Sequence, residues 1–511
     1  MNAKVRNQLR RRQRRITRRL TKQRTFPTAA RVLGNGPARL EVSERIRGTG
    51  AGGVRLAHEL ANSIGLPQEI DSRVNVLKLH LPYHESDHVL AMAFNLLAGG
   101  TYVEDLEHRR NDEAFLDMLG AQRIPDPTTA GDFCRRFESK ESIDRLQQAI
   151  NESRLRVWQR QPTSFFDHAF VDADGTIAET TGSCKEGMDL SYKRTWGYQA
   201  LHITLANTEE VLFQDLRPAS RRSHEGAADR LDEAVVLLRR AGFRAITMRG
   251  DTDFSQTQHL DRWDADGVQF VFGYQAAANL REKAGKLPES AWSTFERKQR
   301  HEVKTEPRTR PRDVKEDIVL ERELYNLHLC KEDIAEFDYQ PGACKKTYRM
   351  VVIRKLITHE RGQRVLFPEL RYLFYITNKR DVAAADVVEM ANKRCNQERT
   401  IGELKSGVNA LGMPLGDLHS NWAYTIIATL AWNLSRWVGL MLPTPESGRW
   451  AKRHTEERSR VTKMRFRTFV QTMMTMPAQI ARSGRQLIIR LLDWSPWRLV
   501  FFRVLDAVRL V

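Results

Sequence analysis

Four acidic residues of this 511-residue chain have the type and spacing to hold divalent metal ions. Asp172 and Asp174 are two positions apart in A-F-V-D-A-D-G-T-I, so on a strand both carboxylates would point to the same face. Asp251 follows the segment F-R-A-I-T-M-R-G, and Glu398 comes after a further 146 residues. Carboxylates are the ligands that Mg²⁺ and Mn²⁺ prefer, and two such ions about 4 Å apart can promote phosphodiester chemistry. Most of the 64 acidic residues must be ordinary surface groups, so these four can bind metal only if the fold places them close together.

Glu398 lies in a segment with helical character, A-A-D-V-V-E-M-A-N-K-R-C-N-Q-E-R-T-I-G-E-L-K, at about 384–406. At about 100° per residue, Arg394, Glu398 and Lys405 fall within about 40° of one another, while Glu403 lies about 140° from Glu398. A carboxylate between two cations suits a phosphate-rich metal site, because Arg and Lys can bind phosphate oxygens. An ordinary salt-bridged surface face would have the same pattern.

The elements that must position these residues alternate between strand and helix patterns. Alternating or continuous apolar segments predict strands at 169–177, 197–206, 211–216, 243–251 and 268–274, with helices at 223–242 and 255–265. Gly242 is the expected helix stop. The order βββαβαβ is that of a ribonuclease H-like α/β fold, although other α/β folds begin similarly. In such a topology Asp174, Asp251 and Glu398 can converge.

The remaining parts suggest an interrupted core with helical ends. Segments such as T-Y-R-M-V-V-I and L-R-Y-L-F-Y-I-T-N indicate a β-rich insertion at 276–378. The apolar segment near 423–442 is interrupted by Asn433 and Arg436, which favours a buried helix over a membrane span. Residues 54–160 are mostly helical in pattern, with Thr128 or Thr129 as a helix cap, and the glycine-rich 48–53 is interpreted as a flexible linker.

Charge is concentrated at the two ends of the chain. The net charge is +18, residues 1–40 hold 13 Lys or Arg and no acid, and residues 446–511 hold 14 against 5 acids. This favours nucleic acid as the partner. The arm 1–25 predicts a basic helix that contacts DNA phosphates, or alternatively a disordered solubilising tail. Its basic residues recur at helical spacing: Arg11, Arg14, Arg15, Arg18, Arg19 and Lys22.

These observations predict six regions: a basic DNA-binding arm and linker (1–45), a helical domain (46–160), the first part of the catalytic core (161–275), the insertion (276–378), the second part of the core (379–445) and a basic helical region (446–511). The five cysteines are odd in number and form no C-x-x-C motif, so a reducing cytosol is expected.

The segment R-C-N-Q-E-R-T-I-G-E-L-K (394–405) resembles the Y-x-x-R-x-x-x-E-x-x-x-x-x-x-K signature of insertion-sequence DDE transposases of the group 1 type. Arg394, Glu398 and Lys405 match its spacing, whereas Ala391 stands at the position of the Tyr. V-D-A-D-G-T and R-G-D-T-D-F resemble the two aspartate strands of this family. They select Asp174 over Asp172 and Asp251 over Asp253. The resemblance covers about residues 50–445.

The resemblance implies a DNA transposase in which Asp174, Asp251 and Glu398 bind Mg²⁺ or Mn²⁺. Such an enzyme frees 3′-hydroxyl groups at the ends of a bacterial element and joins them to target DNA. Its partners would be double-stranded DNA, namely the terminal inverted repeats and the target, and it would act as a dimer on DNA in the cytoplasm. Arg394 and Lys405 would bind phosphate. Trp292 could stack on a displaced base or belong to the core of the insertion.

Two other functions fit the same residues. A regulator derived from a transposase would bind DNA without cleaving it, and the replacement of Tyr by Ala391 is the one feature in its favour. A metal-dependent nuclease would cleave DNA without joining it.

Overall fold

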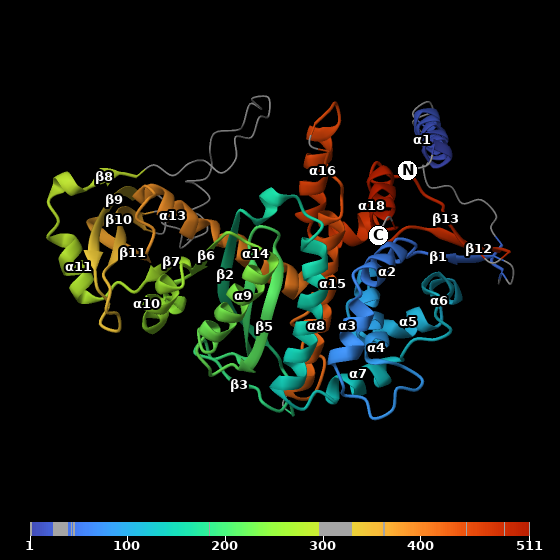
Figure 1. The fold of residues 1–511 in the computed structure, drawn as a ribbon, viewed down its shortest axis with the longest axis horizontal. Helices are drawn as coiled ribbons and strands as arrows, with labels where there is room; N and C mark the ends of the chain where they lie inside the picture. Colours follow the sequence, from blue (N-terminus) through green and yellow to red (C-terminus); the bar gives the residue numbers. More distant parts are fainter. Residues whose placement is uncertain are drawn as a thin grey trace. The chain divides into compact units, whose positions relative to one another are not determined.

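The computed structural model describes residues 3–23, 39–41, 43, 46–182, 184–295, 330–360, 363–445, 447–484 and 486–509. They form two compact units (Figure 1). Unit 1 contains Met1–Phe165, Thr176–Arg222 and Glu398–Val511, and unit 2 contains Phe166–Gly175 and Ser223–Gln397. Strand β2 (His168–Glu179) and helix α14 (Cys395–Gly402) each begin in unit 2 and end in unit 1.

Three parallel strands form the centre of unit 2. β2 pairs with β6 (Ala245–Gly250), and β6 pairs with β7 (Gln269–Tyr274). The helices α9 (Ala227–Ala241) and α10 (Thr257–Ala265) connect into β6 and β7, as the sequence predicts. Helix α9 begins four residues later than expected, after Gly226 in the left-handed conformation, and ends at Gly242 with φ of 99°.

The predicted β-rich insertion is confirmed for its described residues, and it extends the same sheet. β11 (Gln363–Thr377) pairs antiparallel with β7, placing Phe374 opposite Tyr274. The sheet then continues through β10 (Tyr348–Glu360), β9 (Cys330–Tyr339) and β8 (Ser293–Thr294). A short helix, α11 (Ala278–Gly285), precedes β8. Residues 296–329 of the predicted insertion lie outside the described residues.

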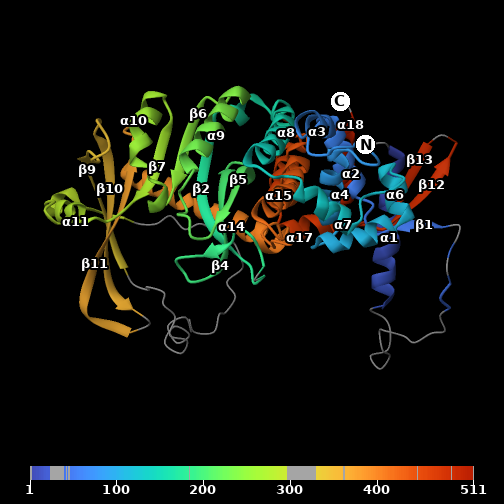
Figure 2. The ribbon, with the colours of Figure 1, turned by 90° about the horizontal axis from the view of Figure 1, so that it is seen from below.

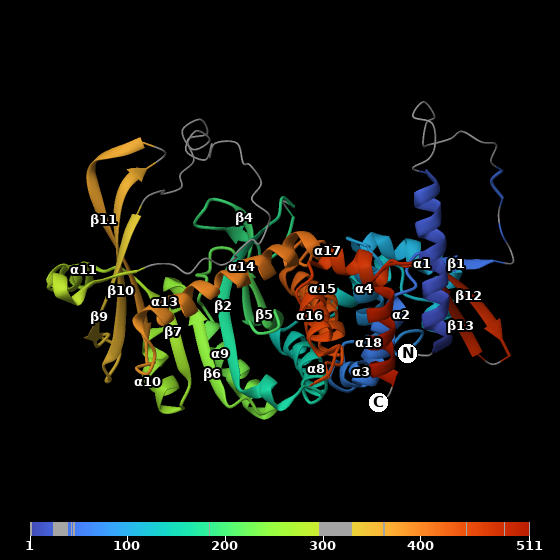
Figure 3. The ribbon, with the colours of Figure 1, turned by 90° about the horizontal axis from the view of Figure 1, so that it is seen from above.

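Helix α13 (Ala384–Lys393) packs on this extended sheet (Figure 3). Val387 and Val388 are fully buried against a cluster that includes Val271 of β7 and Val351 of β10. Because apolar residues one turn apart share a helix face, Ala391 also lies against this cluster, partly buried. The C-terminal end of α13 therefore has a fixed position over the sheet of unit 2.

Unit 1 consists mainly of helices gathered around α15 (Leu418–Leu440), which contacts α2, α4, α7, α8 and α16 (Figure 2). The N-terminal helices are α2 (Val54–Ser63), α3 (Leu66–Arg73), α4 (Glu85–Leu97), α5 (Leu106–Arg110), α6 (Glu113–Leu119), α7 (Pro127–Arg135) and α8 (Lys140–Trp158). The C-terminal helices are α16 (Ala451–Thr462), α17 (Phe466–Phe469) and α18 (Arg498–Arg509).

The polar residues of α15 are buried and hydrogen-bonded. Asn433 accepts from the backbone N–H of Val211 and donates to its carbonyl, both at 3.0 Å. Arg436 donates to the carbonyl of Met464 at 2.6 Å and lies over the Trp432 ring. These contacts explain how an interrupted apolar segment forms a buried helix. No helix in the described part of the chain is both long and apolar enough to span a membrane.

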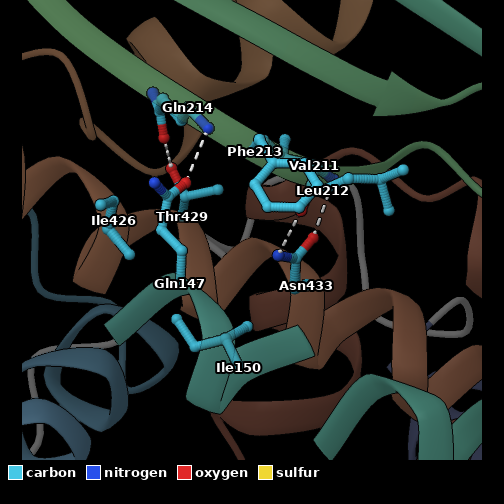
Figure 4. Close-up of a pocket in the computed structure, with 9 residues that line it drawn as sticks. All are labelled: Gln147, Ile150, Val211, Leu212, Phe213, Gln214, Ile426, Thr429 and Asn433. Carbon is cyan, nitrogen blue, oxygen red and sulfur yellow. Dashed lines mark hydrogen bonds between the residues drawn. The ribbon is translucent and has the colours of Figure 1, made fainter. Parts of the chain in front are cut away.

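A small cavity lies between α8, α15 and β5 (Glu210–Pro218), as Figure 4 shows. Its volume is about 20 Å³, which is too small for a substrate. The polar side chains around it bond to one another: the Thr429 hydroxyl donates to Gln214 Oε1, and Gln147 Oε1 accepts from the Gln214 backbone. This cavity belongs to the helical core.

Unit 1 contains the antiparallel strands of the RNase H-like α/β fold. β4 (Trp196–Leu205) pairs antiparallel with β5, and β3 (Asp189–Leu190) pairs with β4. β4 also lies beside the end of β2, where the Thr180 N–H donates to the Trp196 carbonyl at 3.1 Å. The fold class is therefore the one that the strand and helix order predicts, with helical N-terminal and C-terminal regions.

The flexible-linker interpretation of residues 48–53 is wrong. The N–H groups of Gly52 and Gly53 donate to the carbonyls of Met476 and Met474, both at 2.9 Å. A Cβ atom at Gly53 would overlap the backbone at Met473. These glycines therefore permit close packing of two backbones that are more than 400 residues apart in sequence.

The helix cap near residue 128 is also different from the prediction. Asp126 is the N-cap of α7, and its Oδ1 accepts from the Thr129 N–H at 2.9 Å. Pro127 occupies the first helical turn, where its missing N–H costs nothing. The aspartate before the proline is thus the better cap, and Thr129 donates its hydroxyl to the same carboxylate.

Elements near the N-terminus of the chain pack on elements near its C-terminus. The basic helix expected in the arm is α1 (Ala3–Gln23), and residues 24–38 lie outside the described residues. The C-terminal region contains, besides its helices, a hairpin of β12 (Ala478–Ser483) and β13 (Gln486–Leu491). β12 pairs with β1 (Arg47–Thr49). The prediction of a purely helical region over 446–511 is therefore wrong for this segment, because alternation of basic and apolar residues with a period of two is typical of a strand.

Candidate active site

The register of the parallel strands places two of the predicted aspartates side by side. Asp172 of β2 lies opposite Arg249 of β6. Two residues further along are Asp174, still within β2, and Asp251, the first residue after β6, and both carboxylates face Arg394. The carboxyl ends of parallel strands in an α/β sheet are where such folds place their sites.

The carboxylates of Asp174 and Asp251 are held in matching ways. In each, Oδ1 accepts a backbone N–H: Gly175 donates to Asp174 at 2.8 Å, and Asp253 donates to Asp251 at 3.0 Å. In each, Oδ2 faces Arg394, with Nη1 3.0 Å from Asp174 and Nη2 3.9 Å from Asp251. One guanidinium therefore serves two carboxylates of neighbouring strands.

The electrostatics of this pair favour a further cation. Burial raises the pKa of Asp174, and the nearby charge of Asp251 raises it further, while Arg394 opposes both effects. Burial likewise raises the pKa of Asp251 against the opposing effect of Arg394. One arginine thus does not fully offset the cost of holding two partly buried carboxylates ionised.

Asp172 has a different environment. Its carboxylate is buried and accepts two bonds from Arg249, at 2.6 Å from Nε and 2.8 Å from Nη2. Arg249 also donates to the Met390 carbonyl of α13 at 3.0 Å. Both oxygens of Asp172 are therefore occupied in a closed ion pair. The choice of Asp174 as metal ligand stays a prediction, and this geometry favours it.

The turn after β6 is set by close packing. A Cβ atom on Gly250 would lie 2.6 Å from Cβ of Phe254 and 3.2 Å from the Phe272 ring. Only glycine allows the chain to turn there with Asp251 at the strand end. Asp253, the rejected alternative, accepts a hydrogen bond from the Ser223 hydroxyl at 2.7 Å and is exposed.

The single helix predicted over 384–406 is interrupted twice. Arg394 is the C-cap of α13, α14 starts at Cys395, and Glu403–Gly407 form a π-helical turn. The π turn has more residues per turn than an α-helix, so the 100° arithmetic does not apply to Lys405. Gln397 of α14 donates to the Asp172 carbonyl at 3.0 Å and is buried, which anchors the start of this helix in unit 2.

Glu398 is exposed on α14 and is the first residue of unit 1 after Gln397. Its part in a carboxylate triad stays a prediction. Among the described residues, no group of three His, Cys, Asp or Glu side chains is gathered in a metal-binding arrangement. The residue after it, Arg399, forms an ion pair with Glu209 of the β4–β5 turn. This contact fixes the orientation of α14 within unit 1.

Cations gather around Lys405 in unit 1. Partial burial lowers the pKa of Lys405, and the neighbouring charge of Lys193 lowers it further. Burial lowers the pKa of His202 to about 3, with smaller effects from Lys405 and Arg217. Like charges held close together cost free energy, which a bound phosphate would relieve.

The position of the family's Tyr is inside the packing of unit 2. Ala391 lies against the hydrophobic cluster under α13, so a larger side chain there would have to displace apolar neighbours or turn outward. Trp292 is partly buried and stacked under Arg354, whose Cζ is 4.3 Å from the ring centroid. Arg354 is itself held by Glu289 at 2.7 Å and Asp333 at 3.1 Å.

The arginines predicted to bind DNA lie on α1 and are exposed: Arg11, Arg14, Arg15, Arg18 and Arg19. Helix α1 lies beside β13 and α18 (Figures 1 and 3). Arg12 Nη1 donates to the carbonyls of Leu491 at 2.6 Å and Asp493 at 3.1 Å. The helix is therefore attached to unit 1 and not a free tail.

Comparison with known proteins identifies the family. Residues 45–511 match the family described as Transposase DDE domain group 1. The chain belongs to this family. Among solved structures, this DDE transposase is similar to the cryo-EM structure of the piggyBac transposase synaptic complex with hairpin DNA, with a TM-score of 0.37 and 10% sequence identity. The similarity covers 82% of this chain and 81% of that chain. No curated protein gives a significant match.

Two residues at the candidate site are not singled out by the sequence. Arg249 has a recognisable signal, since it interrupts the otherwise buried segment A-I-T-M-R-G in line with an aspartate of the neighbouring strand. A buried cation requires a buried partner. Gln397 has no such signal, because its bond to the Asp172 carbonyl depends on how α14 meets β2.

Proposed function

We propose that this DDE transposase cleaves the ends of an insertion sequence and joins the released 3′-hydroxyl groups to target DNA. Asp174, Asp251 and Glu398 would be its catalytic carboxylates. The observation that carries the proposal is the pair of neighbouring carboxylates, Asp174 within β2 and Asp251 directly after β6, each of which directs one oxygen toward Arg394. The partners would be terminal inverted repeats and target DNA, bound by a dimer in the bacterial cytoplasm.

The carboxylates fit divalent metal ions such as Mg²⁺ or Mn²⁺. Their donors are oxygens only, and burial together with mutual repulsion raises the pKa of Asp174, so a cation beside it would be stabilising. A bound metal would supply Lewis-acid activation of the phosphodiester. Asp174, Asp251 and Glu398 would hold it.

The cations of the chain would position the DNA. Arg394 can hold a phosphate through two parallel hydrogen bonds, which fixes the orientation of the scissile group. Lys405 and Lys193 offer point charges to neighbouring phosphates. The exposed arginines of α1 would add affinity without reading sequence, because phosphate contacts position a protein and base contacts specify the site.

A cleavage and joining assay on element ends tests the proposal. The unchanged protein is expected to nick and join DNA when Mg²⁺ is supplied, and Glu398→Gln should lose both reactions while still binding the ends. Glu403→Gln is the matched control, because Glu403 instead accepts from the Phe466 backbone at 2.9 Å.

The other outcomes separate the competing functions. Binding without any cleavage by the unchanged protein would indicate a regulator, and cleavage without joining would indicate a nuclease. Near-normal cleavage by Glu398→Gln would remove Glu398 from the site.

A further inference from the structure

A groove at the junction of the two chain ends is separate from the carboxylates and has its own chemistry. It lies in unit 1 between α1, α16 and the segment that joins β13 to α18, and has a volume of about 630 Å³. Its floor is apolar, with Leu9, Pro496 and Leu499 beside two tryptophans, Trp450 and Trp494. A volume of this size is in the range of small-molecule sites.

Arginines line the rim of the groove. Arg6 and Arg10 lie one turn apart on α1 and are exposed, and Arg453 and Arg503 come from α16 and α18. Among the described residues that line it, the one acidic residue is Glu457, which pairs with Arg453 at 2.9 Å and also with Arg503. Four arginines against one carboxylate leave the groove strongly positive.

The exposed aromatic surface is the second feature. Trp450 is 51% exposed, although a side chain of this size is normally covered. The guanidinium groups of Arg449 and Arg453 lie 5.3 Å and 5.7 Å from its ring centroid. A tryptophan bordered by arginines combines a stacking surface for a base with donors for the phosphates on either side.

The contacts of α1 show that the groove is built by the fold. Leu9 is 8% exposed, and Arg12 is bonded to the two carbonyls at the end of β13. Arg498, at the start of α18, donates to Asp493 at 2.9 Å and to the Thr472 carbonyl at 2.7 Å. The N-terminal helix and the C-terminal region therefore hold the two walls of one groove together.

We propose that this groove binds an unpaired nucleotide of the DNA, with the base on Trp450 or Trp494 and the flanking phosphates on Arg6, Arg10 and Arg503. A paired duplex presents phosphates but hides the faces of its bases, so it would use the arginines and leave the apolar floor uncovered. An unpaired base satisfies both. This inference rests on the proposed function, which makes DNA the ligand.

The test measures affinities of the full-length protein for three probes: a fully paired duplex, the same duplex with a single-stranded overhang, and a short oligothymidylate. The unchanged protein is expected to prefer the overhang duplex to the paired duplex. Trp450→Leu and Trp494→Leu should weaken binding of the overhang duplex and oligothymidylate by about tenfold, with paired-duplex affinity within about twofold, since base stacking on an aromatic residue has about this effect. Arg10→Gln, on an exposed position, should weaken all three probes.

Trp196→Leu is the matched control, because Trp196 is 53% exposed and does not line the groove. It should leave the preference for the overhang unchanged, and a change as large as that of Trp450→Leu would overturn the proposal. Equal weakening of all probes by the Trp450 and Trp494 variants would show a duplex-backbone site and also overturn it. Unchanged affinities for all probes in both the Trp450→Leu and the Trp494→Leu variants would also overturn it. If the unchanged protein binds none of the three probes, the proposed function itself fails.

Discussion

Asp172 and Asp174 lie two residues apart on one face of β2, and the ion pairs that they form with Arg249 and Arg394 have opposite characters. Asp172 and Arg249 have side-chain exposures of 1% and 4%, and each oxygen of the carboxylate accepts a bond from the same guanidinium. Asp174 and Arg394 have exposures of 15% and 16%, and they share one bond of 3.0 Å. The first pair is closed, and the second is open to a ligand.

The difference comes from where each arginine is attached. Arg249 is a residue of the neighbouring strand, so the sheet register fixes it opposite Asp172. Arg394 is the C-cap of α13, outside the sheet, and has Asp251 as a second carboxylate at 3.9 Å. A fully buried pair is a packing element, whereas a partly exposed pair can exchange partners. Exposure and the origin of the arginine therefore separate a structural aspartate from a candidate ligand.

The largest expected effect concerns the open pair. Asp174→Asn and Asp251→Asn should each lower DNA cleavage by about a thousandfold or more, because several kcal/mol of charge stabilisation would be lost with the metal. Thermal unfolding should stay close to that of the unchanged protein, since both positions are partly solvated. The measurement is end cleavage in Mg²⁺ beside a melting curve. Asp253→Asn is the neighbouring control and should cleave nearly normally. If Asp172→Asn lowered cleavage more than Asp174→Asn did, the closed pair would be the one that holds the metal.

Breaking the closed pair of Asp172 and Arg249 should mainly lower the free energy of unfolding. Asp172→Asn leaves the buried Arg249 without its counter-charge, which typically costs about 3–5 kcal/mol of unfolding free energy. Denaturant unfolding checks this, with cleavage measured where the variant is still folded. Replacing both partners, as Asp172→Leu with Arg249→Met, should recover much of the stability. A single Asp172→Asn variant as stable as the parent would contradict the structural role.

The smallest expected effect tests whether Arg394 acts through its charge or through its planar shape. Arg394→Lys keeps the charge but loses the planar fork, so strand joining should fall by about a hundredfold, the order expected for a positioning error of about 1 Å. DNA binding in the presence of metal should be retained. The assay compares joining by Arg394→Lys with joining by Lys393→Arg, a change at the adjacent exposed position. Joining at the parent rate by Arg394→Lys would show that charge alone suffices.

The sequence by itself determined the local elements and the residues that end them. Alternation in A-F-V-D-A-D-G-T predicts a strand with both aspartates on one face, and the strand predicted over 243–251 ends one residue beyond the observed β6. The basic helix α1 and the buried helix α15 are likewise visible in residue periodicity. These features depend on neighbours within a few residues, so local pattern is enough to predict them.

Tertiary structure decided everything that depends on pairing between distant segments. That Asp172 is closed follows from the Arg249 register, which is set 77 residues away. The glycines at 52 and 53 became packing surfaces because a C-terminal segment lies on them, and the groove under α1 exists because the two chain ends meet. Contacts of this kind arise from burial and backbone hydrogen bonding summed over the whole chain, and no local pattern specifies which distant segment will supply them.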